Sequence, residues 1–185
     1  MDKKYDRFKT EEELLKSVLH SLPYNVYPKV SAIGGKRINP DIDILQIKRI
    51  SENQFQLIGY EIKLMRFNKR SKGLSWSRFY SGIGQALLYL KNGVHRAALV
   101  LGFHENIFSD KLIDEFYRWM WDNKELLKRI FGNHISIGLC LYKNGSISMI
   151  IEADHDFHPL NEKIRLLSTE LLHRKFSFNK KLIGD

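Results

Sequence analysis

Three carboxylates and one amine have residue types and spacing that could bind a metal ion. They are Asp41 and Asp43, followed in the next predicted strand by Glu61 and Lys63. Between positions 55 and 65 the even residues are mostly apolar, so strand alternation places Glu61 and Lys63 together on the opposite face. The same spacing of two places Asp41 beside Asp43. If the two strands are neighbours, their carboxylates can hold a hard divalent cation with an ammonium beside it, which is the chemistry of metal-assisted phosphodiester hydrolysis.

Two short motifs carry a resemblance to a known superfamily. Pro40-Asp41 followed by Glu61-Ile62-Lys63 resembles the signature of the PD-(D/E)XK phosphodiesterases, whose fold is restriction-endonuclease-like. The resemblance implies that Asp41, Glu61 and the backbone carbonyl of Ile62 hold Mg²⁺ or Mn²⁺. It also implies that Lys63 orients or helps to deprotonate the attacking water.

Each of these residues also has an ordinary structural interpretation. Pro-Asp is a favoured turn dipeptide, so Asp41 can belong to a turn. Asp43 lies within the predicted strand, where a carboxylate is disfavoured and calls for a reason. Asp43 could therefore share or replace the metal-binding role of Asp41, and Lys63 could be an exposed strand lysine.

An opening helix is predicted over residues 10–22. Thr10 can cap it, and Glu13 completes a capping-box pattern in front of an apolar run. Helical spacing places Glu11 in the apolar stripe, where a carboxylate needs a partner. In the resembling superfamily an acidic residue of the first core helix faces the metal, which makes Glu11 a further catalytic and metal-binding candidate. An acid favoured there by the helix dipole is an equal alternative.

A second helix is predicted over residues 79–91. Its expected core stripe is Phe79, Ile83, Ala86, Leu87 and Leu90. Gln85 and Tyr89 lie one turn apart on another face, and they resemble the Q-x-x-x-Y element of RecB-like members of the superfamily. That resemblance implies that Gln85 borders the active site and supports the water or Lys63. A polar helix face with one tyrosine is the alternative.

The order of predicted elements matches the core of the same superfamily. Periodicity predicts a helix at 10–22, strands near 25–32, at 41–50 and at 55–65, a helix at 79–91 and a strand at 96–103. We therefore expect an α/β fold with a restriction-endonuclease-like core (α-β-β-β-α-β), in which helices flank a mixed central sheet. The single domain of residues 1–185 would have its core at about 10–103 and a C-terminal extension at about 104–185.

The C-terminal extension is predicted from pattern alone. It comprises a long amphipathic helix at 109–131, a hairpin of 135–142 and 146–153 that turns at Lys143-Asn144-Gly145, and a helix near 159–173. Asn-Gly between two alternating runs is a strong hairpin signal.

The chain is basic, with a net charge of +9, and part of this charge is concentrated near the acidic motifs. One segment without acidic residues contains Arg66, Lys69, Arg70, Lys72, Trp76 and Arg78, and a second basic pair, Lys36 and Arg37, precedes Asp41. Beside a metal site, such residues would follow a phosphate backbone while a ring stacks on a base. We assign them, together with Tyr89, to nucleic-acid binding, and a solvated flexible loop is the alternative.

Other features restrict the class of protein. Cys140 is the single cysteine, which excludes an internal disulfide and a cysteine-rich metal site. The segment Asp154–His158 holds metal-capable side chains, but these residue types are typical of turns, so we expect a surface loop. The charged N-terminus and the short apolar runs predict a cytoplasmic protein that does not cross a membrane, and the composition is typical of a prokaryotic or viral source.

These features predict a Mg²⁺- or Mn²⁺-dependent deoxyribonuclease. Duplex, branched and single-stranded DNA stay open as substrates, because both junction resolvases and RecB-like end-processing enzymes resemble this chain. The resemblance to small, basic junction resolvases also implies a homodimer. One alternative is a catalytically inactive nucleic-acid-binding protein of the same fold. Another is an interaction protein whose carboxylates lie too far apart to share one cation.

Overall fold

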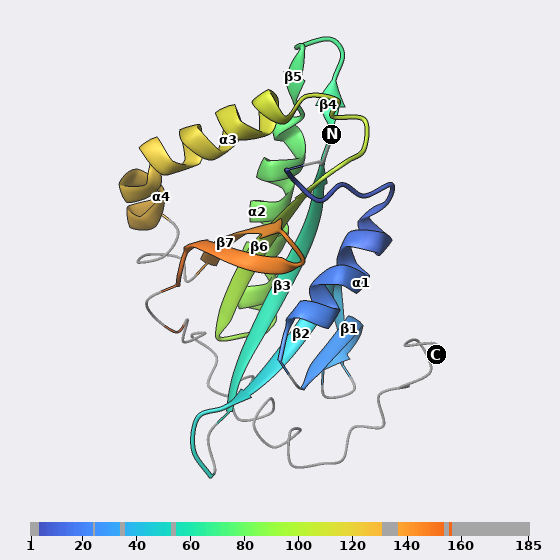
Figure 1. Ribbon diagram of the computed structural model, residues 1–185. Coiled ribbons are helices and arrows are strands. Elements are labelled where there is room, and N and C mark those ends of the chain that lie inside the picture. Colours follow the sequence, from blue (N-terminus) through green and yellow to red (C-terminus); the bar gives the residue numbers. More distant parts are fainter. Residues whose placement is uncertain are drawn as a thin grey trace.

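A computed structural model describes residues 4–23, 25–33, 36–52, 55–130, 137–153 and 156. In chain order the elements are α1 (Glu11–Ser21), β1 (Val26–Ile33), β2 (Lys36–Arg49), β3 (Phe55–Met65), β4 (Phe67–Asn68), β5 (Gly73–Leu74), α2 (Trp76–Lys91), β6 (Arg96–Phe103), α3 (Asp110–Asp122), α4 (Lys124–Ile130), β7 (Ile137–Lys143) and β8 (Ser146–Ile151). Six strands form one sheet in the order β1-β2-β3-β6-β7-β8, and β4 and β5 form a separate small hairpin (Figure 1).

The six-stranded sheet is parallel in its centre and antiparallel towards both edges. β3 pairs parallel with β6, and β6 pairs parallel with β7. The pairs β1–β2, β2–β3 and β7–β8 are antiparallel. Parallel neighbours need a crossover connection, and α2 and the α3–α4 segment lie in these two connections. The protein is therefore mixed α/β, with helices flanking a mixed sheet.

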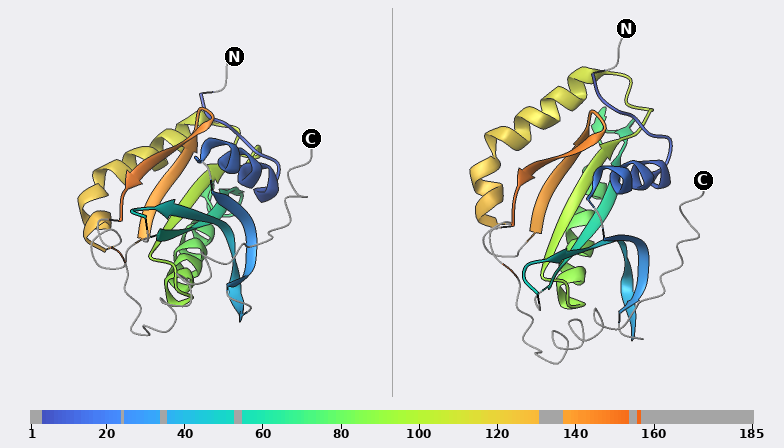
Figure 2. Two further views of the ribbon diagram at one scale, coloured as in Figure 1. Left: turned by 90° about the horizontal axis from the view of Figure 1, so that it is seen from below. Right: turned by 60° about the horizontal axis from the view of Figure 1, so that its bottom comes forward.

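Strand β3 is buried on both faces, and its alternate residues meet different helices. Tyr60 and Ile62 pack in a cluster with α1 residues, whereas Leu57 and Met65 pack in clusters that contain α2 residues. Figure 2 shows α1 and α2 on opposite sides of the sheet. The predicted alternation is confirmed, and it carries Glu61 to the side covered by α2.

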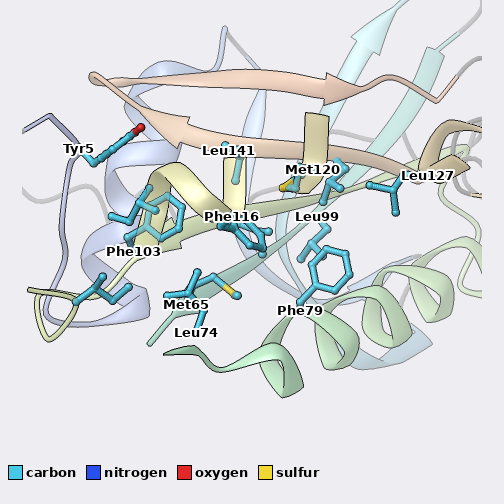
Figure 3. Packing of buried hydrophobic residues seen from close by; sticks show 14 of the residues in the cluster. Tyr5, Met65, Leu74, Phe79, Leu99, Phe103, Phe116, Met120, Leu127 and Leu141 are labelled. Atoms are coloured by element: carbon cyan, nitrogen blue, oxygen red, sulfur yellow. The ribbon is translucent and has the colours of Figure 1, made fainter. Parts of the chain in front are cut away.

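The largest apolar cluster joins α2 and α3 to the sheet (Figure 3). Phe79 of α2, together with Phe116 and Met120 of α3, packs with Leu99 of β6 and Leu141 of β7. Because this cluster packs the N-terminal half of α2 against the strands and against side chains of α3, it determines where the residues of that helix lie.

The long helix predicted over 109–131 is wrong in one respect, because the chain forms two helices there. α3 ends at Asp122 and α4 begins at Lys124. Asn123 between them has φ −102° and ψ 10°, and its side-chain amide donates to the carbonyl of Trp119 at 2.8 Å. The backbone N–H of Asn123 donates to the same carbonyl at 3.1 Å, so the backbone and the side chain of Asn123 both bind the last turn of α3.

Helix α2 also differs from its predicted form. It begins at Trp76, after the N-cap residue Ser75, and its buried residues are Phe79, Gly82, Ala86, Tyr89 and Leu90. Leu87 was expected in this stripe, but it is 41% exposed. The helix is therefore rotated about its axis relative to the predicted stripe. Gly82 explains this rotation, because a β-carbon there would lie 2.5 Å from Leu99 Cδ1. The helix thus approaches β6 along a line that requires glycine.

The structure also defines where β2 begins and where the chain turns between β7 and β8. β2 begins at Lys36, so Lys36 and Arg37 belong to a strand and not to a loop before Asp41. The predicted turn between β7 and β8 is confirmed, since Asn144 and Gly145 have positive φ values of 52° and 73°. The helix predicted near 159–173 lies outside the described residues.

Candidate active site

Two carboxylates bind the edge of β3 beyond the point where its pairing with β2 ends. β2 pairs with β3 only as far as Ile44. Beyond this point the backbone N–H of Ile62 donates to Asp43 Oδ2 at 2.8 Å, and that of Leu64 donates to Glu11 Oε1 at 3.3 Å. Acidic side chains from a strand and from a helix thus satisfy neighbouring backbone donors on one edge.

The separation of β2 from β3 comes from a bend in β2. Ile44 packs with α1 residues, whereas Ile42 packs with Tyr89 of α2. Residues two apart in a regular strand face the same side, so the chain must rotate at Asp43. The ladder between β1 and β2 also shifts its register next to this point. The rotation directs the Asp43 carboxylate to the backbone of Ile62.

Glu61 lies beneath α2, and only 1% of its surface is exposed. Its Oε1 atom forms an ion pair with the ammonium of Lys63, and its Oε2 atom contacts the hydroxyl of Tyr89. That hydroxyl also lies 3.0 Å from the carbonyl oxygen of Asp41 and accepts from the backbone N–H of Asp43 at 3.2 Å. Tyr89 therefore links the buried glutamate of β3 to the bend in β2.

The assignment of Tyr89 to nucleic-acid binding was wrong, because this side chain is fully buried. Two glycines bring it inside. Gly82 lets α2 approach the sheet, and Gly59 leaves room for the ring, since a β-carbon there would lie 3.0 Å from Tyr89 Cδ2. The tyrosine of the Q-x-x-x-Y pattern is consequently a neighbour of Glu61 in the interior.

The pKa values of Asp43 and Glu61 are both raised above those of ordinary carboxyl groups. Burial, and next the charge of Asp43, raise the pKa of Glu61 to about 7, although Lys63 and Tyr89 act to lower it. Burial likewise raises the pKa of Asp43, against the lowering effect of the Ile62 N–H and of Lys63. The charge of Glu11 adds to this rise. Lys29 also acts to lower the pKa of Asp43, and Glu11 is paired with Arg78, so three carboxylates and several basic side chains share this region.

The hydrogen bonds of Tyr89 agree with a proton on Glu61. The hydroxyl has one proton, but it contacts two acceptors, Glu61 Oε2 and the carbonyl of Asp41. Both contacts are hydrogen bonds when Glu61 is protonated, because Glu61 then donates to Tyr89 and Tyr89 donates to Asp41.

A pocket of about 420 Å³ opens beside this pair. Its lining residues are Glu11, Lys63, Ser77, Arg78, Ser81 and Gln85. Arg78 pairs with Glu11, which places a guanidinium at the pocket wall. The structure thus brings Glu11, Lys63 and Gln85 together as predicted. It also adds Ser77 and Ser81, which the sequence analysis missed although their i, i+4 spacing with Gln85 marks one polar line on α2.

Asp41 is not part of this cluster through its side chain. The residue is exposed, and its contact with Tyr89 uses the backbone carbonyl. Within the described part of the chain, no hydrogen bond or ion pair reaches its carboxylate. Since Asp43 raises the pKa of Glu61 and binds Ile62, Asp43 is the aspartate that the fold brings to the site.

The basic segment before α2 forms a small hairpin. β4 and β5 pair antiparallel, and Asn68 Oδ1 accepts from the N–H of Arg70 at 2.9 Å. Lys69, Arg70 and Lys72 are exposed, whereas Arg66 is half-buried. Basic side chains therefore project from a small hairpin at the start of α2.

The other residues predicted to bind nucleic acid, Trp76, Lys36 and Arg37, lie outside the β4–β5 hairpin. Trp76 is half-buried and its ring lies 4.7 Å from that of Trp119, so it belongs to an aromatic cluster. Arg37 is exposed at the end of the β1–β2 hairpin, opposite Ala32. The backbone of Lys36 lies opposite Ile33 in the same hairpin.

Asp43 and Glu61 fit a small site for a hard cation. Among the described residues, no group of three or more His, Cys, Asp or Glu side chains is close enough to hold a metal ion. Mg²⁺, however, is usually held by one or two carboxylates and keeps several waters. Glu61 Oε1 is buried and, despite its ion pair with Lys63, receives no aligned hydrogen bond. This carboxylate oxygen has lone pairs that a cation beside Lys63 could use.

Asp156 and His95, which lie outside the candidate site, have hydrogen-bond partners. Asp156 accepts from Gln56 Nε2 and from Arg96 Nε, each at 2.6 Å, and its neighbours Asp154, His155, Phe157 and His158 lie outside the described residues. His95 Nδ1 accepts from the N–H of Leu57 at 3.0 Å. Cys140 is a free, buried thiol.

In the described part of the chain, no helix has the length and apolar character needed to span a bilayer.

Comparison of the sequence with protein-family models, and of the chain with curated proteins and with solved structures, finds no match.

Proposed function

We propose that this protein is a metal-dependent phosphodiesterase that hydrolyses DNA, built on a restriction-endonuclease-like core. The observation that carries the proposal is the meeting of Asp43 and Glu61 where β2 leaves β3, with Lys63 in contact with Glu61. The order α1-β1-β2-β3-α2-β6 around this point agrees with that core, with the β4–β5 hairpin inserted before α2.

Asp43 and Glu61 would hold Mg²⁺ or Mn²⁺ together with the carbonyl oxygen of Ile62. In a strand the N–H and C=O of one residue point to the same neighbour, so this carbonyl shares the edge on which Asp43 binds the Ile62 N–H. The metal would lower the pKa of a bound water and offset the charge of the transition state. Asp43 takes the role that the resemblance gave to Asp41.

Lys63 and Arg78 would have different roles in the reaction. Lys63 contacts Glu61 and lines the pocket, so its ammonium can orient a water there, and only its neutral amine form could accept a proton from that water. Arg78 also lines the pocket and uses one of its five N–H donors on Glu11. The other donors can bind a phosphate oxygen, and the hydroxyl of Ser77 and the amide of Gln85 can bind water or phosphate beside it.

The substrate assignment rests on charge and position. Lys69, Arg70 and Lys72 are exposed on the hairpin that leads into α2, the helix that carries Arg78. A polyanion bound across the hairpin would release counterions and reach the pocket with its phosphodiester groups. We assign DNA as this polyanion. A homodimer stays a prediction from the resemblance to junction resolvases.

One observation favours a second candidate, a nucleic-acid-binding protein without turnover. Glu61 is almost fully buried, and both of its carboxylate oxygens contact protein groups. In this candidate the ion pair with Lys63 has a structural role, and the basic hairpin binds nucleic acid without cleavage.

Cleavage of labelled single-stranded, duplex and four-way-junction DNA with Mg²⁺, Mn²⁺ or EDTA separates the candidates. The nuclease is expected to cut only with metal, and Lys63→Ala is expected to remove cutting while DNA affinity stays within a few-fold. Lys48→Ala, an exposed lysine of β2, is the matched control and should cut normally. Binding without cutting by the unaltered protein supports the second candidate. Metal-independent cutting, or normal cutting by Lys63→Ala, contradicts the proposed site.

A further inference from the structure

An exposed aromatic surface borders the pocket on α2. Tyr80 is 64% exposed, and it lies three residues after Ser77 and one before Ser81, both of which line the pocket. Side chains three apart on a helix are neighbours, with β-carbons about 5–6 Å apart. Tyr80 therefore lies beside Ser77 at the margin of the pocket.

A second exposed ring reaches the same surface from another helix. Trp119 of α3 is 38% exposed and packs edge to face on Trp76, with ring centroids 4.7 Å apart. The Trp76 ring also lies 6.4 Å from that of Tyr80 and 5.3 Å from that of Phe116. Trp76 is thus the half-buried support between two exposed rings, and its own packing reduces the freedom of both.

Charge next to these rings indicates what they bind. The β4–β5 hairpin lies at the N-terminal end of α2 (Figure 1), and its exposed Lys69, Arg70 and Lys72 precede Trp76 by only a few residues. Exposed rings beside basic side chains are the two features that bind single-stranded nucleic acids. The basic side chains bind the phosphate backbone, and the rings stack on the bases. In a duplex the bases are already stacked and paired, so a ring of this kind gains contact only with unpaired bases.

We infer that Tyr80 and Trp119 form a stacking platform, supported by Trp76, for unpaired bases of a DNA strand that enters the pocket. This inference rests on the proposed function and specifies its substrate as single-stranded DNA or the unpaired end of a duplex. The basic hairpin binds the phosphates of the same strand, and the next phosphodiester lies at Arg78. The platform explains why two large rings remain exposed beside a polar pocket.

The chain offers a matched control for the platform. Leu87 lies on the same side of α2 as Tyr80, is 41% exposed, and stands seven residues further from the basic hairpin. Removal of either side chain takes away exposed apolar surface from one helix face. Stacking, however, is lost only with Tyr80. Alanine favours helix at both positions, so neither change should unfold α2.

The experiment measures the binding of fluorescein-labelled oligothymidylate, and of a duplex of equal length, by anisotropy in EDTA, where cleavage is absent. Tyr80→Ala is expected to raise the Kd for the single strand about tenfold, the effect of losing one stacked base, and to change the duplex Kd less than about twofold. Tyr80→Phe and Leu87→Ala should keep the affinity of the unaltered protein. Metal-dependent cutting of single-stranded DNA is assayed separately, so a failure of the platform and a failure of the nuclease give different results.

Two results would overturn the inference. The first is an unchanged single-strand Kd for Tyr80→Ala. The second is an equal loss of affinity for Tyr80→Ala and Leu87→Ala, accompanied by a change from dimer to monomer in sedimentation. That second result would assign this face to contact between two copies of the chain.

Discussion

Replacement of Glu61 with glutamine should stabilise the protein at alkaline pH much more than at acid pH. The pKa of Glu61 is raised in the folded state from its ordinary value of 4.5 to about 7, chiefly by burial. The folded protein therefore binds this proton more tightly than the unfolded chain does. The corresponding stability is fully present below about pH 4.5 and is lost as the pH rises through about 7.

The size of the effect follows from the difference between the two pKa values, which is about 2.5. At about 1.36 kcal/mol for each pKa unit, ionisation of Glu61 costs the folded state roughly 3 kcal/mol above pH 7. Glutamine has nearly the same volume and cannot ionise, so the variant avoids this cost. The difference in free energy of unfolding between Glu61→Gln and the unaltered protein should therefore change by roughly 3 kcal/mol from acid to alkaline pH.

Urea denaturation in EDTA, at several pH values from about 4.5 to 8 and at constant ionic strength, measures this difference. Glu105→Gln, at an exposed glutamate, is the control and should show almost no pH-dependent difference. An equal difference in the free energy of unfolding between Glu61→Gln and the unaltered protein at both ends of the pH range would contradict the raised pKa of Glu61.

The same variant tests metal binding without an activity assay. Above pH 7, Mg²⁺ or Mn²⁺ at about a hundred times its Kd should stabilise the unaltered protein by about 2.7 kcal/mol. Glu61→Gln should lose most of this gain, because the amide is a weaker ligand and carries no charge. Equal stabilisation of both proteins by the metal would place the cation elsewhere.

Three further predictions concern the site and its supports. Asp43→Asn should reduce metal-dependent cleavage at least about a hundredfold, whereas Asp41→Asn should change it little, and kinetic assays of the matched pair check this. Lys63→Ala should lower turnover but leave Kd for DNA within a few-fold, as measured by single-turnover cleavage beside anisotropy. Gly82→Ala should destabilise the fold by about 1–3 kcal/mol in thermal unfolding, because its β-carbon would lie 2.9 Å from Lys63 Cγ and closer still to a leucine of β6. Gly84→Ala, whose β-carbon would meet nothing within 4 Å, should instead stabilise by about 0.5–1 kcal/mol.

Features that depend on neighbouring residues were predictable from the sequence. The alternation in β3 needs only the residues of one strand, and it correctly placed Glu61 and Lys63 on one face. Thr10 caps α1, since its Oγ1 accepts from the N–H of Glu13 at 3.2 Å. Glu13 departs slightly from the expected capping box, because its carboxylate accepts from the N–H of Lys9 at 2.7 Å and not from that of Thr10.

Features that depend on how α2 meets the sheet were not predictable from its helical pattern. Periodicity placed Leu87 in the core and Tyr89 on another face. The observed helix is rotated because Gly82 packs against Leu99. A glycine carries no hydrophobic signal in a periodicity argument, although its missing side chain determines the line of closest approach.

Residue order alone was enough to name the groups that could do metal chemistry and the strand face that two of them share, because a period of two is a local property. It did not determine which aspartate meets Glu61. That choice depends on the bend of β2 between Ile42 and Ile44, whose side chains pack against different helices. Contacts of this kind join residues far apart in the chain, so long-range packing assembled Asp43, Glu61 and the buried Tyr89 into one site.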